Sequence, residues 1–286
     1  MSLAGEASAP QQVWASLDQA RRNAAYDNNA AVVGSAALIE ARNAASAKYR
    51  EAHPRGLNIP YGPGARTAFD LYPASSARAP CLVFIHGGYW QRNSRELFAA
   101  YAEGLALAGW SVAMPGYSLA PQANLTTIVQ EIGAALDWLA DHGRAHGVAG
   151  AVVLAGWSAG AQLAVLHLGH RLVAAGLAIS GVYDLRPLRD TALNDPLKLS
   201  DEEIATLSPL RSPPTPKPLA IAYGTCELPA LVHDSRELHA LRSAAHAPGP
   251  LLPIAGGDHF SILEELRRPN GALVRAAQRL VEDVSS

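Results

Sequence analysis

The residues best suited to chemistry in this 286-residue chain form the motif Gly156-Trp157-Ser158-Ala159-Gly160. The motif follows an apolar run at 151–155 and opens a segment with helical spacing. Glycines on both sides of a serine permit a sharp strand-to-helix turn that exposes the hydroxyl at the carboxyl edge of a sheet. The first N–H groups of such a helix point toward the same spot. The pattern therefore predicts Ser158 as a nucleophile, the alternative being a chance Gly/Ser turn.

A second motif, HGGYW at 86–90, follows the apolar run at 81–85. Acyl transfer builds negative charge on the carbonyl oxygen, and backbone N–H donors aimed at that oxygen stabilise it. We expect Gly88 and Tyr89 to supply such donors from the loop, with Gly87 as a substitute. Ala159, directly after the nucleophile, should supply another. The histidine of this motif, His86, is expected to orient the loop rather than to move protons.

A serine nucleophile needs a base, and His259 is the best candidate among ten histidines. It lies near the C-terminus in GGDHF at 256–260, after the last predicted strand. This position fits the order serine, acid, histidine along the chain. Surface or packing roles are expected for the others, which are His53, His142, His146, His167, His170, His233, His239 and His246.

The acid that orients the histidine should follow a strand end between Ser158 and His259. Glu227 lies just past the predicted strand at 219–223 and is the first choice. Asp184 is the second choice, and a solvated loop carboxylate is the alternative role for Glu227. Asp258 is the immediate neighbour of His259, which makes a hydrogen bond to the same imidazole awkward.

Composition and charge limit the classes of binding partner and the compartment to be expected for this chain. The net charge is −2 with no Lys/Arg run, so neither nucleic acid nor an anionic membrane is expected. No apolar stretch approaches a membrane-spanning length, and Met1–Gln12 has no signal-peptide pattern. The two cysteines, Cys81 and Cys226, suit a reducing compartment, so a cytoplasmic location is expected. We find no metal or cofactor motif and expect no cofactor.

Strand and helix patterns alternate after residue 66, which predicts an α/β fold with a mostly parallel sheet covered on both faces. Strands are predicted at 67–72, 81–85, 110–114, 151–155, 177–180, 219–223 and 251–254. Helices are predicted at 14–22, 35–50, 94–108, 126–140, 159–175, 234–243 and 272–284.

The chain divides by pattern into a helical N-terminal segment at 1–60, with no strand signal, and a catalytic domain at 61–286. Within that domain, 183–218 is polar and proline-rich, with a short helical signal at 201–206. We expect this insertion to lie over the active face.

Together these residues resemble a known family. The elbow at 156–160 and the HGG at 86–88 resemble the α/β-hydrolase superfamily, near the hormone-sensitive-lipase-like esterases. The fuller HGGYW is similar to the kynurenine formamidase (arylformamidase) group and its bacterial esterase relatives. Further similar segments extend the resemblance from about residue 20 to the end of the chain; these are 26–29, 115–121, 180–188, 208–209 and 258–260.

The resemblance implies the α/β-hydrolase fold, with Ser158, Glu227 and His259 at the family's triad positions. It also implies Gly88, Tyr89 and Ala159 as oxyanion donors. The sequence departs from the family at three positions. Trp157 stands where His is common, and Leu231 and Asp234 stand where Phe and Gln are usual.

The expected activity is hydrolysis of a small acyl amide or ester through an acyl-enzyme, with an aryl formamide such as N-formylkynurenine as a candidate substrate. A general short-chain carboxylesterase and a non-catalytic binding protein are the alternatives. Trp90, Tyr117, Trp157 and Tyr183 are candidates to line an aromatic pocket, with core packing as the other role. The expected partner is a small-molecule acyl substrate, and assembly as a homodimer stays open.

Overall fold

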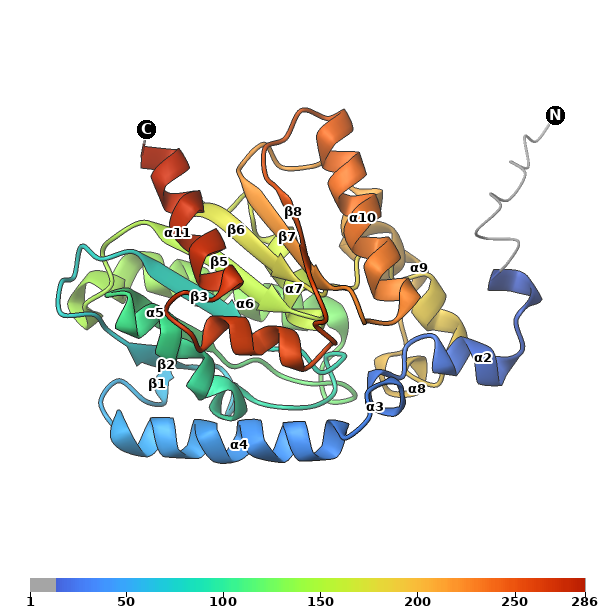
Figure 1. The fold of residues 1–286 in the computed structure, drawn as a ribbon, viewed down its shortest axis with the longest axis horizontal. Helices are drawn as coiled ribbons and strands as arrows, with labels where there is room; N and C mark the ends of the chain where they lie inside the picture. Colours follow the sequence, from blue (N-terminus) through green and yellow to red (C-terminus); the bar gives the residue numbers. More distant parts are fainter. Residues whose placement is uncertain (1–13, 286) are drawn as a thin grey trace.

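The computed structural model describes residues 14–285, so the prediction about Met1–Gln12 falls outside the described residues. The centre of the molecule is an eight-stranded sheet in the order β1-β2-β4-β3-β5-β6-β7-β8 (Figure 1). Strands β3 to β8 run parallel to one another, whereas β2 pairs antiparallel with both β1 and β4. The strands are β1 (Ile59–Pro60), β2 (Ala68–Tyr72), β3 (Cys81–Ile85), β4 (Ser111–Pro115), β5 (Val152–Trp157), β6 (Val173–Ile179), β7 (Leu219–Gly224) and β8 (Leu251–Ile254).

Helices cover both faces of this sheet, which confirms the predicted fold class. The α-helices from α2 onward are α2 (Gln19–Ala24), α3 (Asn28–Ala31), α4 (Ser35–Ala52), α5 (Glu103–Leu107), α6 (Leu125–His142), α7 (Ala159–Leu166), α8 (Asn194–Leu197), α9 (Asp201–Leu207), α10 (Pro229–Ala244) and α11 (Ala272–Ser285). The 3₁₀ helices are η1 (Arg95–Ala102), η2 (Gly143–His146), η3 (Pro187–Asp190), η4 (Pro209–Arg211) and η5 (Ser261–Leu266).

The central strand β3 explains why its sequence is apolar throughout. Successive side chains of a strand point to opposite faces. Leu82 and Phe84 enter the core beneath η1, α5 and α11, whereas Val83 and Ile85 enter the core beneath α6 and α7. All of β3 is buried, as expected for a parallel strand covered on both faces.

Three predicted elements need correction. The predicted helix at 159–175 ends at Leu166, because the chain turns and returns as β6 from Val173. Gly176, the residue directly after the predicted helix, lies inside β6, where an added Cβ would come within 2.7 Å of Leu219 Cδ1. The predicted helix at 94–108 is the 3₁₀ helix η1 followed by α5. The short strand β1 falls in the segment at 1–60 where no strand was expected.

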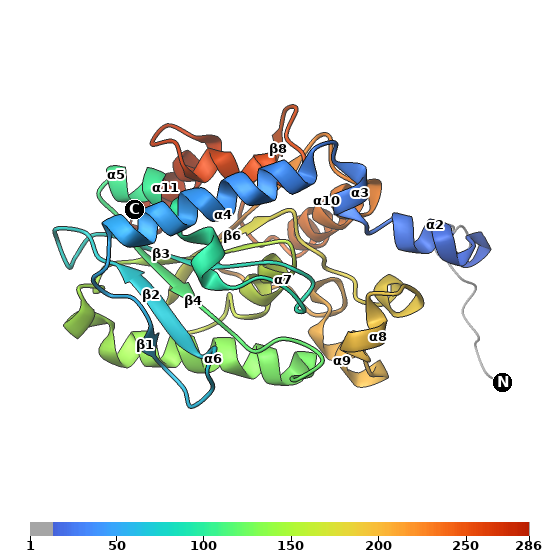
Figure 2. The same cartoon turned by 90° about the horizontal axis from the view of Figure 1, so that it is seen from below.

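Helix α4 packs along η1 on the outside of the molecule, as Figure 2 shows. Ser46 lies fully buried at this contact, where its Oγ donates to Leu97 O (3.0 Å) and accepts from Ala100 N (3.2 Å). A small, hydrogen-bonded residue lets the two helices approach closely. This contact holds α4 against η1, which itself covers one face of the sheet.

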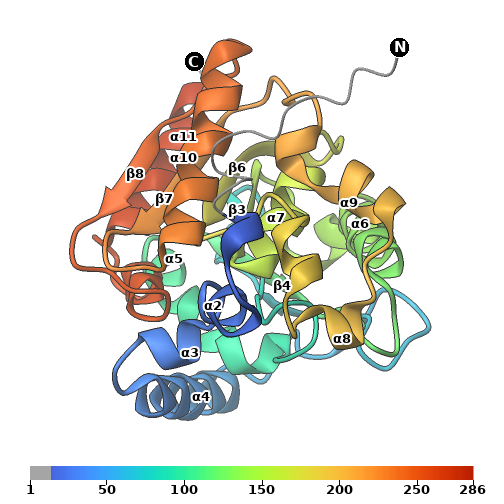
Figure 3. The ribbon, with the colours of Figure 1, turned by 90° about the vertical axis from the view of Figure 1, so that its right-hand side faces the viewer.

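Helix α2 contacts η3 of the 183–218 insertion at the right-hand end of the molecule in Figure 1, the end that faces the viewer in Figure 3. Trp14 Nε1 donates to Asp190 Oδ2 (2.9 Å), and Ala192 N donates to Asn23 Oδ1 (2.9 Å). Two segments far apart in the sequence therefore lie against each other here.

Candidate active site

Ser158 lies in the turn that joins β5 to α7, with φ 57° and ψ −124°. Residues other than glycine rarely adopt this backbone conformation, so the surrounding turn must impose it. An added Cβ on Gly156 would come within 2.0 Å of Gly160 O, and one on Gly160 within 2.1 Å of Ile85 O. Both positions require glycine because backbone atoms occupy the space a side chain would need.

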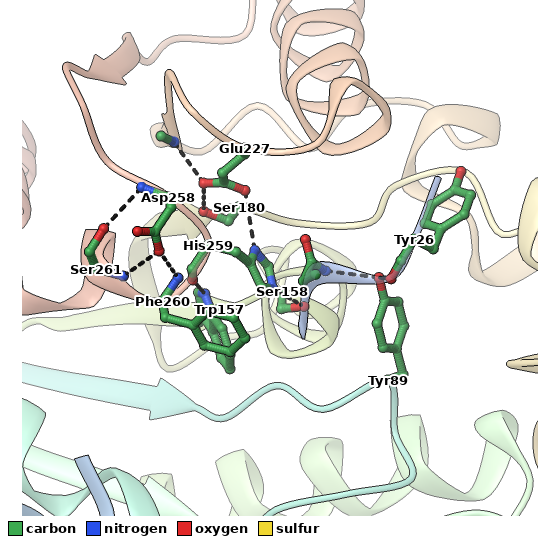
Figure 4. A network of polar contacts seen from close by, with 12 residues as sticks. Tyr26, Tyr89, Trp157, Ser158, Ser180, Glu227, Asp258, His259, Phe260 and Ser261 are labelled. Carbon is green, nitrogen blue, oxygen red and sulfur yellow. Dashed lines mark hydrogen bonds and ion pairs between the residues drawn. The ribbon is translucent and has the colours of Figure 1, made fainter. Parts of the chain in front are cut away.

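Ser158, His259 and Glu227 lie in one hydrogen-bonded chain (Figure 4). Ser158 Oγ is 3.1 Å from His259 Nε2, and His259 Nδ1 is 3.2 Å from Glu227 Oε2. All three side chains are buried. A hydroxyl, an imidazole and a carboxylate in this order can pass a proton from serine to histidine.

The runner-up acids are used elsewhere. Asp184 forms a bidentate ion pair with Arg211, at 3.0 and 2.9 Å. Asp258 Oδ1 accepts from the backbone N–H groups of Phe260 and Ser261, which shapes the turn that carries His259. The structure thus brings Glu227, rather than either aspartate, to the imidazole.

Ser180 binds the other carboxylate oxygen of Glu227, a role that no motif in the sequence indicated. Its Oγ donates to Glu227 Oε1 at 2.5 Å, and Gly224 N donates to the same oxygen at 2.7 Å. Ser180 is fully buried with φ 52°, in the left-handed region, directly after β6. With Oε1 occupied, Oε2 is left to face His259.

Trp157, which departs from the family pattern, contacts both the backbone and the ring of His259. Its Nε1 donates to His259 O at 2.9 Å, and the two ring centroids lie 4.7 Å apart. The indole therefore fixes the backbone that carries the imidazole. A smaller histidine at this position would need another geometry to reach the same carbonyl.

The loop after β3 presents N–H groups beside Ser158. Gly88 has φ 123° and Tyr89 has φ 50°, so the chain turns sharply here. Within residues 14–285, the N–H groups of Gly88, Tyr89 and Ala159 have no hydrogen-bond acceptor. An added Cβ on Gly87 would come within 2.8 Å of Ser158 Cβ, so glycine allows the loop to approach the serine.

His86 is built into the base of this loop. Tyr117 stacks on its ring, at a centroid distance of 4.3 Å, and donates through its OH to His86 O at 2.7 Å. Burial lowers the pKa of His86 to about 3, so the ring stays neutral at physiological pH. Its position agrees with the orienting role expected from the sequence.

A cavity of about 940 Å³ opens over Ser158 and His259. Its lining corrects the predicted aromatic pocket. Trp157 lines the cavity, but Trp90, Tyr117 and Tyr183 do not, and all three are fully buried in the core.

Much of the cavity wall instead comes from the N-terminal segment, which the sequence did not indicate, and from the insertion, which was expected over the active face. The N-terminal contributors are Asn23, Tyr26, Asp27, Asn28, Asn29, Ala30, Ile39 and Arg42. The insertion contributes Thr191, Ala192 and Leu193. Tyr89 links this wall to the loop, because its OH donates to Tyr26 O (2.8 Å) and accepts from Asn28 Nδ2 (3.1 Å; Figure 4).

No group of three or more potential metal-ligating side chains occurs within residues 14–285. Over the same range, no helix is long and apolar enough to span a membrane.

Asp234 is a buried carboxyl group in the first half of α10, the helix that begins just after Glu227. Its Oδ2 accepts from the N–H groups of Tyr183 (2.6 Å) and Asp184 (3.1 Å). Burial outweighs these donors and raises the pKa of Asp234 to about 7 from an ordinary value of 3.8. The folded protein therefore keeps a proton that the unfolded chain releases at lower pH.

This shift predicts a pH-dependent stability. Because the folded state binds the extra proton, the free energy of unfolding should fall as the pH rises from about 4 to about 7. Asp234→Asn keeps an acceptor oxygen but cannot ionise, so it should gain on the order of 1–3 kcal/mol relative to the native chain between pH 4.5 and 8. Urea unfolding at both pH values measures this, and parallel profiles for the two proteins would contradict it.

Comparison with known proteins gives three results. The BD-FAE family model matches residues 69–171. The kynurenine formamidase of Salmo salar is 30% identical over 231 residues, covering 73% of this chain and 76% of the relative. That of Danio rerio is 26% identical over 245 residues, covering 79% and 81%.

Solved structures show the same fold. A protein from Silicibacter sp. TM1040, provisionally assigned as a thioesterase, superposes with a TM-score of 0.79 at 28% identity, covering 90% of this chain and 98% of the other. Esterase B from Lactobacillus rhamnosis superposes with a TM-score of 0.69 at 22% identity, covering 87% and 96%. With the fold and the sequence similarity in agreement, the chain is a hydrolase of the α/β-hydrolase fold and belongs to the kynurenine formamidase family.

Proposed function

We propose that this hydrolase cleaves small acyl amides through a covalent acyl-enzyme, with aryl formamides such as N-formylkynurenine as its substrates. The observation that carries the proposal is the Ser158–His259–Glu227 chain, with Ser158 held in a strained turn at the floor of the cavity. The kynurenine formamidase relatives support the choice of substrate.

In the first half-reaction, Ser158 Oγ attacks the carbonyl carbon of the substrate while His259 Nε2 takes its proton. The oxyanion that forms accepts hydrogen bonds from the N–H groups of Gly88, Tyr89 and Ala159. His259 then donates the proton to the amide nitrogen as the C–N bond breaks, and the amine leaves. Glu227 holds the imidazole in the required orientation and stabilises its charged form.

In the second half-reaction, water attacks the ester formed on Ser158. His259 takes a proton from the water and returns it to Ser158 Oγ when the acyl C–O bond breaks, releasing the acid. These steps use only protein groups and water.

Activity as a short-chain carboxylesterase is the second candidate function, and it is favoured by the positions at which the sequence departs from the family pattern. Trp157, Leu231 and Asp234 replace the family's usual residues on or near the elements that hold His259 and Glu227. Esters are chemically easier to cleave by the same route, so activity on them alone is the outcome that identifies this alternative.

A substrate panel separates the two candidates. The quantity to compare is kcat/KM divided by the rate constant of the uncatalysed hydrolysis. We expect it to be larger for N-formylkynurenine and formanilide than for p-nitrophenyl acetate and butyrate. Labelling with a fluorophosphonate, located by peptide mass spectrometry, should modify Ser158. Cleavage of the esters without cleavage of either formamide would reject the formamidase proposal, and labelling elsewhere would reject the mechanism.

A further inference from the structure

Two arginines line the site cavity without an acidic partner. Arg42 comes from α4 and Arg92 from the loop after β3. No carboxylate in residues 14–285 lies within 4.0 Å of either guanidinium. Asp27 also lines the cavity, but it caps α3 by accepting from Ala30 N at 3.1 Å.

Arg42 is the more informative of the two because it is only 7% exposed. Its Nε and Nη2 donate to Asn43 Oδ1, at 3.1 and 2.8 Å, and its guanidinium lies 4.3 Å from the centre of the Phe98 ring. A buried cation without a counter-ion is costly unless a ligand supplies the missing charge. The desolvation is strong enough to lower the pKa of Arg42, yet arginine stays charged in proteins.

One end of this guanidinium is free to bind. Within the described residues, Arg42 Nη1 has no hydrogen-bond acceptor, and it is not among the polar atoms sealed from solvent. A ligand in the cavity can therefore reach the Nη1 donors. By contrast, a guanidinium that only held the fold together would have its donors occupied by protein oxygens.

The position of Arg42 is fixed relative to Ser158. Arg42 Nη2 is 3.5 Å from Asn93 Oδ1, and Asn93 Nδ2 donates to Gly87 O at 3.1 Å. Arg42 also borders a second cavity of about 190 Å³, which shares Ile39, Trp157 and Phe260 with the first. Arg42 thus lines both cavities and is tied through Asn93 to the loop that approaches the serine.

We propose that Arg42, assisted by Arg92, forms an anion subsite that binds a carboxylate carried by the substrate away from the scissile bond. The inference rests on the proposed function and narrows its substrates to acyl amides that carry such a carboxylate. A planar carboxylate matches the fork of a guanidinium, which makes charge-assisted hydrogen bonds to it. Such a contact should favour the carboxylate by about 10–100-fold over an uncharged group of the same shape.

The test compares two formamides that differ only in this group, 3-(2-formamidophenyl)propanoate and 3-(2-formamidophenyl)propanamide. For the native enzyme we expect kcat/KM to be about 10–100-fold higher for the carboxylate. Arg42→Gln should bring this ratio close to one, and Arg92→Gln should lower it by less. Lys48→Gln is the matched control, since it removes the same charge from an exposed position of α4 outside the cavity, and its ratio should equal the native one.

Each outcome decides a separate question. A native ratio near one overturns the subsite but leaves the proposed function standing. A native enzyme that cleaves neither formamide contradicts the proposed function, and the subsite with it. If Arg42→Gln lowers both rates and keeps the ratio, Arg42 is structural and the subsite is wrong.

A second measurement needs no variant. Competitive inhibition of the native enzyme by 3-phenylpropanoate should be about 10–100-fold tighter than by 3-phenylpropanamide, and it should weaken as salt is added. Equal inhibition constants for the two compounds would also overturn the subsite.

Discussion

Replacing Ser158 by alanine is expected to lower kcat for formamide and ester substrates by about 10⁴–10⁶-fold. The change removes the only atom that can attack the carbonyl in the proposed mechanism. Alanine keeps a Cβ, so the strained φ of 57° and the packing of the turn should be almost unchanged. Initial rates under saturating substrate measure the loss, and circular dichroism checks the fold.

The control for this variant is Ser243→Ala, at an exposed position near the end of α10. It should keep native kcat and KM. An alanine variant at 158 that retained more than about one-hundredth of the native rate would exclude covalent catalysis through this serine, because water alone cannot sustain such turnover.

Gly160→Ala is expected to cost at least about 3 kcal/mol of folding free energy, at the upper end for overpacked sites. The new Cβ would come within 2.1 Å of Ile85 O and 2.5 Å of His86 O. Both are backbone atoms, and β3 is paired on both sides, with β4 and β5, so neither can shift without disturbing the sheet. Urea unfolding measures the loss.

Gly169→Ala provides the matched control. It lies just beyond α7, and its added Cβ would meet nothing closer than Thr215 at 3.8 Å. Its stability should stay within about 0.5 kcal/mol of the native value. Equal midpoints for the two glycine variants would show that the turn can relax, and would remove the steric argument for the elbow.

The parts of the structure that could be predicted from sequence are those set by local pattern. The continuous apolar run of β3 matches the structure at both ends, since burial on both faces leaves no polar position. Ser158, Glu227 and His259 each follow a predicted strand, and the ends of parallel strands meet at one edge of a sheet. Their proximity could therefore be predicted. Their catalytic roles stay a prediction until the variants are measured.

The parts that could not be predicted depend on contacts between distant segments. The run from Ala159 to Ala175 is rich in good helix formers, so only pairing with β5 and β7 shows that its end is a strand. The role of Ser180 appears only when β6 and β7 bring it to Glu227, 47 residues away. The charge on Arg42 gave no signal either, because the packing of α4 on η1 is what directs it to the cavity.

The wall of the cavity has a consequence for how this enzyme can change over time. Ser158, His259 and Glu227 all follow strands of the sheet, whereas the N-terminal helices and the 183–218 insertion supply much of the surface that a substrate meets. Substitutions on those segments can alter substrate choice without touching the hydrogen bonds among the three proposed catalytic residues. Exchange of residues 14–52 between relatives is therefore a route to new substrate selectivity with the same proposed catalytic residues. It requires that Tyr26 and Asn28 keep their hydrogen bonds to Tyr89.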